Sequence, residues 1–183
     1  MIPSDDQRPV PLLILDLDGT VRFGKDELGH FVNSPDDVKI FPEAIDRMAA
    51  WKARGGRIIG VSNQGGVALG IVTRAAAQAA VAETNRQTGG LFDAALLCPH
   101  HPQAPDPAMR RCWCRKPRAG LAIEAATILT IHYPNDYYPA DQMLVVGDRD
   151  EDRGCAQALS ADFLPASAWR EDGPTSPLRS CPV

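Results

Sequence analysis

Acidic side chains follow two of the most apolar segments of the chain. Asp16 and Asp18 come directly after residues 12–15, and Asp148 comes directly after residues 143–147. Side chains two apart along an extended segment point the same way, so we expect Asp16 and Asp18 to face a common point. Carboxylates held close together repel one another unless a cation neutralises them, and three hard oxygen donors suit Mg²⁺. The spacing predicts a magnesium site that also takes ligands from a phosphate-bearing substrate.

These acids can meet only if the strands that precede them end at the same edge of a sheet, and the apolar pattern predicts such strands. Strands are expected at residues 11–16, 57–63, 92–97, 143–148 and 161–166, with helices at 42–55, 73–86, 118–130 and 151–159. Strands alternating with helices indicate an α/β domain with a mostly parallel sheet. In that architecture sites collect at the carboxyl ends of the strands. Ser62 and Asn63 should therefore lie beside Asp16, Asp18 and Asp148.

The composition is that of an ordinary globular protein. The 183 residues predict one domain, 44% of them are hydrophobic and 23% are charged. A net charge of −4 gives no general reason to expect binding to nucleic acid or to anionic membranes. No apolar run approaches the ~20 residues of a membrane span. We expect a cytoplasmic monomer whose tail, from residue 168 to 183, is loosely ordered.

A segment rich in proline and cysteine, residues 98–117, carries a second set of possible ligands. Cys98, His100, Cys112 and Cys114 together offer three thiolates and one imidazole, which can form a closed tetrahedral zinc site. The segment has few large apolar residues, so something other than a core must order it. The alternative is a loop with free or buried cysteines, and His101 could replace His100 as the ligand. The pattern favours a structural zinc.

The motifs "DLDGT" (16–20), "SNQ" (62–64), Lys116 and "GDRDED" (147–152) resemble those of the haloacid dehalogenase superfamily of phosphatases, in order and spacing. The resemblance runs from about residue 12 to 164 and implies a Rossmann-like core. It implies that Asp16 is the nucleophile and Asp18 the general acid and base. Further implied roles are phosphoryl-oxygen binding by Ser62 and Lys116, and Mg²⁺ binding by Asp16, the backbone carbonyl of Asp18, and Asp148. Arg149 and Asp152 would lie behind the metal, where Asp152 orients bound water.

The sequences "CPHHP" and "CWCRKP" narrow the resemblance to the zinc-bearing branch that contains heptose bisphosphate phosphatases and histidinol phosphatases. This branch implies zinc binding by Cys98, His100, Cys112 and Cys114, and a small zinc-binding loop in place of a large cap domain. It also implies that Arg115 recognises the substrate, and we expect Asn63 and Gln64 to join it.

The function predicted is a Mg²⁺-dependent phosphomonoester hydrolase acting on a small phosphorylated metabolite, with a heptose bisphosphate as the first candidate. The alternatives within the enzymes are a histidinol-phosphate phosphatase and a polynucleotide 3′-phosphatase, although the net negative charge opposes the latter. The alternatives outside the enzymes are a receiver-like phosphoacceptor and a zinc-braced interaction module.

Overall fold

The computed structural model describes residues 7–24 and 32–172, and its centre is a five-stranded parallel sheet. The strands are β2 (Leu12–Leu15), β5 (Arg57–Asn63), β6 (Ala94–Cys98), β8 (Met143–Gly147) and β9 (Asp162–Pro165). Their order across the sheet is β6-β5-β2-β8-β9, with β2 in the middle. The predicted strands are confirmed, and so is the mostly parallel sheet. Because β2 lies between β5 and β8, the polar residues that follow these three strands meet at one edge.

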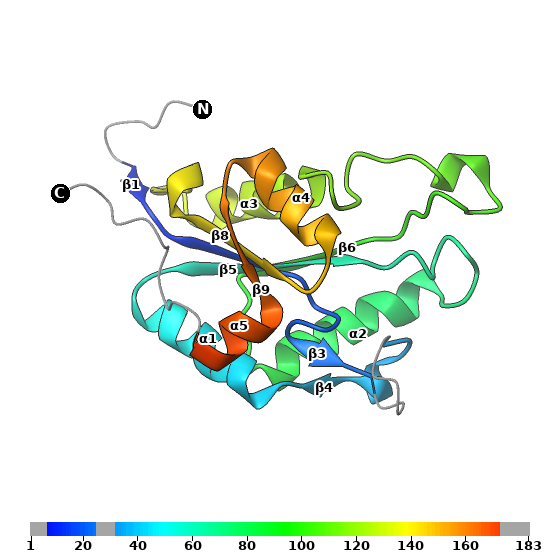
Figure 1. Cartoon of the computed structure of the whole chain (residues 1–183), viewed down its shortest axis with the longest axis horizontal. Coiled ribbons are helices and arrows are strands. Elements are labelled where there is room, and N and C mark those ends of the chain that lie inside the picture. Colours follow the sequence, from blue (N-terminus) through cyan, green and yellow to red (C-terminus); the bar gives the residue numbers. More distant parts are fainter. Residues whose placement is uncertain (1–6, 25–31, 173–183) are drawn as a thin grey trace.

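Helices cover both faces of this sheet (Figure 1). They are α1 (Pro42–Ala53), α2 (Arg74–Gln87), α3 (Gly120–His132), α4 (Asp150–Leu159) and α5 (Ala166–Asp172). Successive side chains of β2 enter different cores: Leu13 and Leu15 pack with α1 and α5, whereas Leu12 and Ile14 pack with α3 and α4. A strand buried on both faces must be apolar at every position, which explains the unbroken run "LLIL".

Local sequence signals explain where two of the helices begin. Pro42 is the first residue of α1, where its missing N–H has no intrahelical partner to lose. Thr73 precedes α2, and its hydroxyl oxygen accepts a hydrogen bond from the N–H of Ala76 at 3.1 Å. Both starts agree with the sequence prediction to within a residue.

Only short elements interrupt this alternation in the described residues. Two pairs of two-residue strands are β1 (Arg8–Pro9) with β7 (Asp136–Tyr137), parallel, and β3 (Arg22–Phe23) with β4 (Lys39–Ile40), antiparallel. Turns of 3₁₀-helix occur at Pro35–Asp37, Pro107–Met109 and Ala140–Gln142. Within the described part of the chain no insertion is large enough to be a cap domain, as predicted. No helix there is long and apolar enough to cross a bilayer.

The prediction of a loosely ordered tail is wrong for residues 168–172. These residues belong to α5, and the indole of Trp169 is fully buried against the face of the sheet that α1 covers. The Gly, Pro and Ser residues that suggested a loose tail begin only at Gly173. Residues 173–183 lie outside the described part of the structure.

Candidate active site

A tight turn after β2 brings the first pair of acids into position. The carbonyl of Leu17 accepts hydrogen bonds from the N–H groups of Thr20, Val21 and Arg22 at 3.3, 2.9 and 2.9 Å. Gly19 has φ +82°, and a Cβ there would lie 2.3 Å from Oδ2 of Asp148. Only glycine combines this left-handed backbone with such close approach. Gly19 therefore allows the turn that carries Asp16 and Asp18 to contact Asp148.

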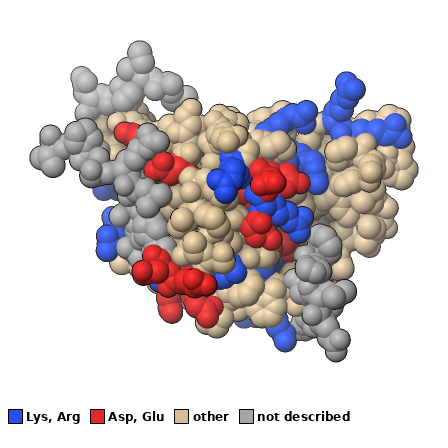
Figure 2. Space-filling view, viewed as in Figure 1, with Lys and Arg blue, Asp and Glu red and all other residues tan. Residues whose placement is uncertain are grey.

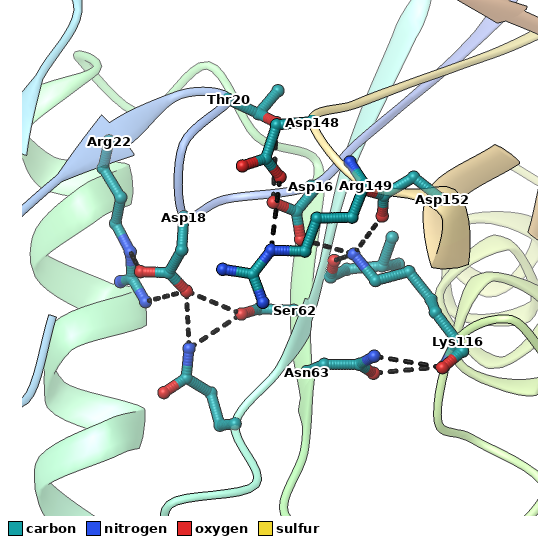
Figure 3. A network of polar contacts seen from close by, with 12 residues as sticks. Asp16, Asp18, Thr20, Arg22, Ser62, Asn63, Lys116, Asp148, Arg149 and Asp152 are labelled. Carbon is teal, nitrogen blue, oxygen red and sulfur yellow. Dashed lines mark hydrogen bonds and ion pairs between the residues drawn. The ribbon is translucent and has the colours of Figure 1, made fainter. Parts of the chain in front are cut away.

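Asp16 forms a buried ion pair with Lys116 (Figure 3). The two residues are 7% and 3% exposed. Lys116 Nζ donates to Oδ1 of Asp16, to the carbonyl of Val61 at 2.7 Å and to Oδ1 of Asp152 at 2.7 Å. Burial raises the pKa of Asp16 to about 7 in spite of the opposing attraction of Lys116. Burial alone would lower the pKa of Lys116, but its two carboxylate partners hold that pKa above its usual value.

Asp148 and Asp152 complete a group of three carboxylates around Asp16. One oxygen from each lies within 4.8 Å of the others. Burial raises the pKa of Asp148, and the Arg149 guanidinium opposes that rise. The side chain of Asp18 is not a member of this group, and its expected contribution to metal binding was its backbone carbonyl. Three converging hard oxygen donors suit Mg²⁺, which would relieve their mutual repulsion.

The start of α4 fixes the orientation of Asp152. Its Oδ2 accepts a hydrogen bond from the N–H of Arg149 at 3.1 Å, which caps the helix, while its Oδ1 faces Lys116. A Cβ on Gly147 would lie 2.2 Å from Cγ of Asp152, so the glycine that ends β8 makes room for this carboxylate. Asp152 thus orients the Lys116 ammonium as well as lying near the other two acids.

Asp18 faces a different set of donors. Its Oδ1 accepts from Nε of Arg22 at 3.0 Å. Its Oδ2 accepts from Arg22 Nη2 at 3.2 Å, from Ser62 Oγ at 3.1 Å and from Gln64 Nε2 at 2.7 Å. The sequence analysis missed Arg22, which is 0% exposed. Its signal was a lone arginine between the apolar residues Val21 and Phe23, four positions after Asp18.

Asn63 joins β5 to the segment that carries Lys116. Its Oδ1 accepts from the Lys116 N–H at 3.0 Å, and its Nδ2 donates to the Lys116 carbonyl at 3.1 Å. Gln64 donates to Ser62 Oγ at 2.8 Å as well as to Asp18. Both side-chain amides are therefore hydrogen-bonded to other groups of the protein. Contact of Asn63 and Gln64 with a substrate stays a prediction.

The four proposed zinc ligands converge in the segment 98–117. Sγ of Cys98 lies 3.2 Å from Sγ of Cys114 and 3.6 Å from Sγ of Cys112. His100 Nδ1 lies 3.6 Å from Sγ of Cys98 and 3.4 Å from Sγ of Cys114. A tetrahedron with Zn–S bonds of 2.3 Å has sulfurs about 3.8 Å apart, so these spacings suit one zinc ion. Burial raises the pKa of the Cys98 and Cys114 thiols, and a bound cation would favour their thiolates.

The remaining histidine and the basic residues of this segment lie outside the ligand cluster. His101 Nδ1 accepts from the N–H of Gln103 at 3.2 Å, and His101 is not among the four converging residues. Arg115 Nη1 donates to the carbonyl of His100 at 3.0 Å, which ties Arg115 to the cluster. On the face shown in Figure 2, basic side chains gather over this segment, and charges of both signs intermix at the centre.

A single cavity gathers most of the predicted site residues. It is lined by Asp16, Asp18, Ser62, Asn63, Arg115, Lys116, Arg149, Glu151 and Asp152. A second cavity shares Asn63, Arg115 and Arg149 with the first and adds Gln64, His101 and the apolar side chains of Leu69, Ile71 and Val72. Of the residues predicted from sequence, only the zinc ligands and Asp148 line neither cavity. Arg115 and Arg149 therefore line both a pocket rich in carboxylates and a more apolar cavity.

Comparison with known proteins identifies relatives over most of the chain. No family model matches the sequence. The D-glycero-beta-D-manno-heptose-1,7-bisphosphate 7-phosphatase of Escherichia coli K12 is 30% identical over 161 residues, which cover 84% of this chain and 76% of that protein. The bifunctional histidine biosynthesis protein HisB of Legionella pneumophila is 30% identical over 159 residues, which cover 85% of this chain and 41% of HisB.

A solved structure agrees with these relatives. The D,D-heptose 1,7-bisphosphate phosphatase from B. bronchiseptica, in complex with magnesium and phosphate, superposes with a TM-score of 0.62 at 29% identity. The match covers 85% of this chain and 79% of that one. The chain therefore belongs to the haloacid dehalogenase family of phosphatases and is an enzyme that hydrolyses phosphoric monoesters.

Proposed function

We propose that this phosphatase acts on a small sugar bisphosphate, with heptose 1,7-bisphosphate as the first candidate, through a phosphoaspartyl intermediate on Asp16. The observation that carries the proposal is the buried Asp16–Lys116 pair at the point where β2, β5 and β8 end beside Asp148 and Asp152. A carboxylate attacks an anionic phosphate only where nearby cations reduce their repulsion. The Lys116 ammonium supplies one such charge in a site shielded from water.

The chemistry assigns one role to each acid of the first motif. An oxygen of Asp16 attacks phosphorus, the bond from phosphorus to the leaving oxygen breaks, and that oxygen takes the bond's electron pair and a proton from the Asp18 carboxyl. Water then attacks the phosphoaspartate and gives its proton to the Asp18 carboxylate. The bond from phosphorus to Asp16 breaks, which releases phosphate and restores both side chains. Ser62 and Lys116 line the cavity beside Asp16 and would hold the phosphoryl oxygens.

Two metals fit the residues present. Mg²⁺ would bind to Asp16, Asp148 and the backbone carbonyl of Asp18, and it would supply positive charge for the phosphoryl oxygens. Zinc would bind to Cys98, His100, Cys112 and Cys114 and leave no open position, so its role is structural. The segment that the zinc would brace leads directly into Arg115 and Lys116. Asp152 lies behind the metal ligands and directs Lys116, whereas Arg149 lines the pocket, with its Nε 3.8 Å from Oδ1 of Asp148.

Two arginines support a substrate with a second phosphate. Arg115 and Arg149 line both the pocket of Asp16 and the adjoining cavity. A guanidinium binds phosphate in a bidentate manner and keeps its charge at all physiological pH values. The leaving group of the first phosphate would extend into the adjoining cavity, where these cations meet any second anionic group. HisB as a relative makes histidinol phosphate the second candidate substrate.

A substrate panel tests this proposal. Phosphate release should be measured with Mg²⁺ for heptose 1,7-bisphosphate, histidinol phosphate, simple sugar monophosphates and a 3′-phosphorylated oligonucleotide, ranked by kcat/KM. We expect the bisphosphate to rank first, and Arg115→Met to lower its kcat/KM more than that of a monophosphate. A first rank for histidinol phosphate, or an equal effect of Arg115→Met on both sugar classes, contradicts the assignment of a second phosphate.

A further inference from the structure

Arg22 is a buried cation that the roles above leave unexplained. It is 0% exposed and lies on β3, between α2 and the turn that carries Asp18. A guanidinium without water costs stability unless partners satisfy its charge and its N–H groups. Its contacts therefore show what the fold gains from keeping it there.

The guanidinium joins Asp18 to helix α2. Nε and Nη2 of Arg22 donate to the two oxygens of Asp18 at 3.0 and 3.2 Å, in a bidentate pair. Nη1 donates to the carbonyl of Ala80 and to Oγ1 of Thr84, both at 2.9 Å. The Thr84 hydroxyl in turn donates to the Ala80 carbonyl at 2.7 Å. A planar fork held on both sides leaves the carboxylate of Asp18 little freedom to rotate.

Each acid of the first motif thus has its own buried cation. Asp16 pairs with Lys116, and Asp18 pairs with Arg22, on opposite sides of the site (Figure 3). The other donors to Asp18 are Ser62, on β5, which lines the phosphoryl pocket, and Gln64, which directly follows that strand. A bound phosphoryl group would compete for the Ser62 hydroxyl, whereas Arg22 is out of its reach in the core. Arg22 does not line that pocket, so its two hydrogen bonds to Asp18 should persist when substrate binds.

Resting on the proposed function, we propose that Arg22 is a positioning residue for the proton transfers of Asp18. As the leaving oxygen takes its proton, negative charge forms on the Asp18 carboxyl group, and a preorganised bidentate partner stabilises charge formed there. The same fork presents the carboxylate to the water of the second step. Its effect should therefore depend on how much the leaving oxygen needs a proton.

Aryl and benzyl phosphates of similar size provide the test. The leaving group of p-nitrophenyl phosphate departs without protonation, that of phenyl phosphate needs some, and that of benzyl phosphate needs a full proton. In Arg22→Lys, which keeps the charge but loses the fork, we expect kcat/KM to fall about 10²-fold for benzyl phosphate and only a few-fold for p-nitrophenyl phosphate. In an Asp18→Asn background the same substitution should add nothing. Equal losses on all three substrates, or full additivity with Asp18→Asn, overturn the proposal.

Two further variants keep the test decisive. Thr84→Val removes one acceptor of Arg22 with little change of shape. It should lower kcat/KM more for benzyl phosphate than for p-nitrophenyl phosphate, by a smaller factor than Arg22→Lys, and it keeps the test available if Arg22→Lys fails to fold. Arg57→Lys is the control, since Nε and Nη2 of Arg57 both donate to Oδ2 of the buried Asp136, at the start of β5 and away from the site. Its losses should be equal across substrates. A wild-type enzyme inactive on these esters and on every sugar phosphate of the substrate panel would contradict the proposed function instead.

Discussion

The acids at the sheet edge, Asp16, Asp148 and Asp152, and the segment 98–117 are ordered in opposite ways. At the sheet edge, Asp16 and Asp152 are buried, and protein donors hold both carboxylates. In the segment, half of the residues are exposed, and the buried ones include Cys98 and Cys114 of the proposed zinc cluster. The sheet orders the first region, whereas the proposed zinc ion would order the second. Loss of Mg²⁺ should stop the chemistry and leave the fold, but loss of zinc should disturb both, because the two regions meet at Arg115 and Lys116.

The largest expected effect comes from the nucleophile. Asp16→Asn should lower kcat by at least about 10³-fold, because an amide cannot accept the phosphoryl group. Its thermal stability without Mg²⁺ should nevertheless rise at pH 8, on the order of 1 kcal/mol or about 2–4 °C in Tm. Phosphate-release kinetics and thermal melts without added Mg²⁺ measure the two effects. Residual turnover above a tenth of the wild-type rate would contradict the role of Asp16.

The pH dependence of that stability follows from the raised pKa of Asp16. Because the folded pKa, about 7, lies above the unfolded value, the stabilising contribution is complete below pH ~4 and is lost as the pH rises through 7. The asparagine variant has no such loss. Its Tm advantage without Mg²⁺ should be present at pH 8 and absent at pH 4. An advantage that does not change between these pH values would mean that Asp16 is not destabilised by burial.

The next effect should come from the zinc cluster. Cys114→Ser should reduce bound zinc to well below one equivalent and lower the unfolding free energy by about 3 kcal/mol or more, because a ligand to the metal is lost. Activity should fall with it, since Lys116 follows Cys114 by two residues. Metal analysis, denaturant titration and kinetics at saturating Mg²⁺ provide the measurements.

Cys155 provides the control for that substitution. It is a buried cysteine on α4 outside the cluster. Cys155→Ala should cost packing energy but keep the zinc content of the wild type. If Cys114→Ser and Cys155→Ala retained equal zinc, the segment would need another explanation for its order.

A smaller effect should appear where the two regions are joined. Asn63→Ala removes the two hydrogen bonds that hold the backbone of Lys116, so we expect kcat/KM to fall roughly tenfold. Asn85→Ala is a matched control, because Asn85 Oδ1 also accepts from a backbone N–H, that of Phe92 at 3.2 Å, away from the site. Both variants should lose similar stability, and only Asn63→Ala should lose activity. Equal kinetics in the two variants would show that the tether does not position Lys116.

The sequence predicts the parts of this molecule that depend on short motifs and periodic patterns. Apolar runs that end in Asp16, Asn63 and Asp148 located the sheet edge, and the cysteine spacing located the cluster. Arg22 left only a weak signal, a lone arginine between two apolar residues, and Arg170 left none, because the sequence does not show whether an arginine binds water or distant protein groups. Those partners come from α2 and from the turn after β2, which only the tertiary fold brings near.

Arg170 leads to the smallest of the expected effects. It lies on α5, stacks on the ring of Phe41 at 4.1 Å and donates to the carbonyls of Gly19 and Thr20 at 2.8 and 2.9 Å. Arg170→Met keeps the apolar stem and loses both hydrogen bonds, so it should lower stability by about 1–2 kcal/mol and kcat a few-fold, by loosening the turn beside Asp18. Arg47→Met is the control, since Arg47 ties α1 to the carbonyls of Arg170 and Glu171 without touching that turn. A loss of kcat in both variants would assign the effect to α5 as a whole, whereas a loss in Arg170→Met alone would assign it to the two carbonyls that follow Asp18.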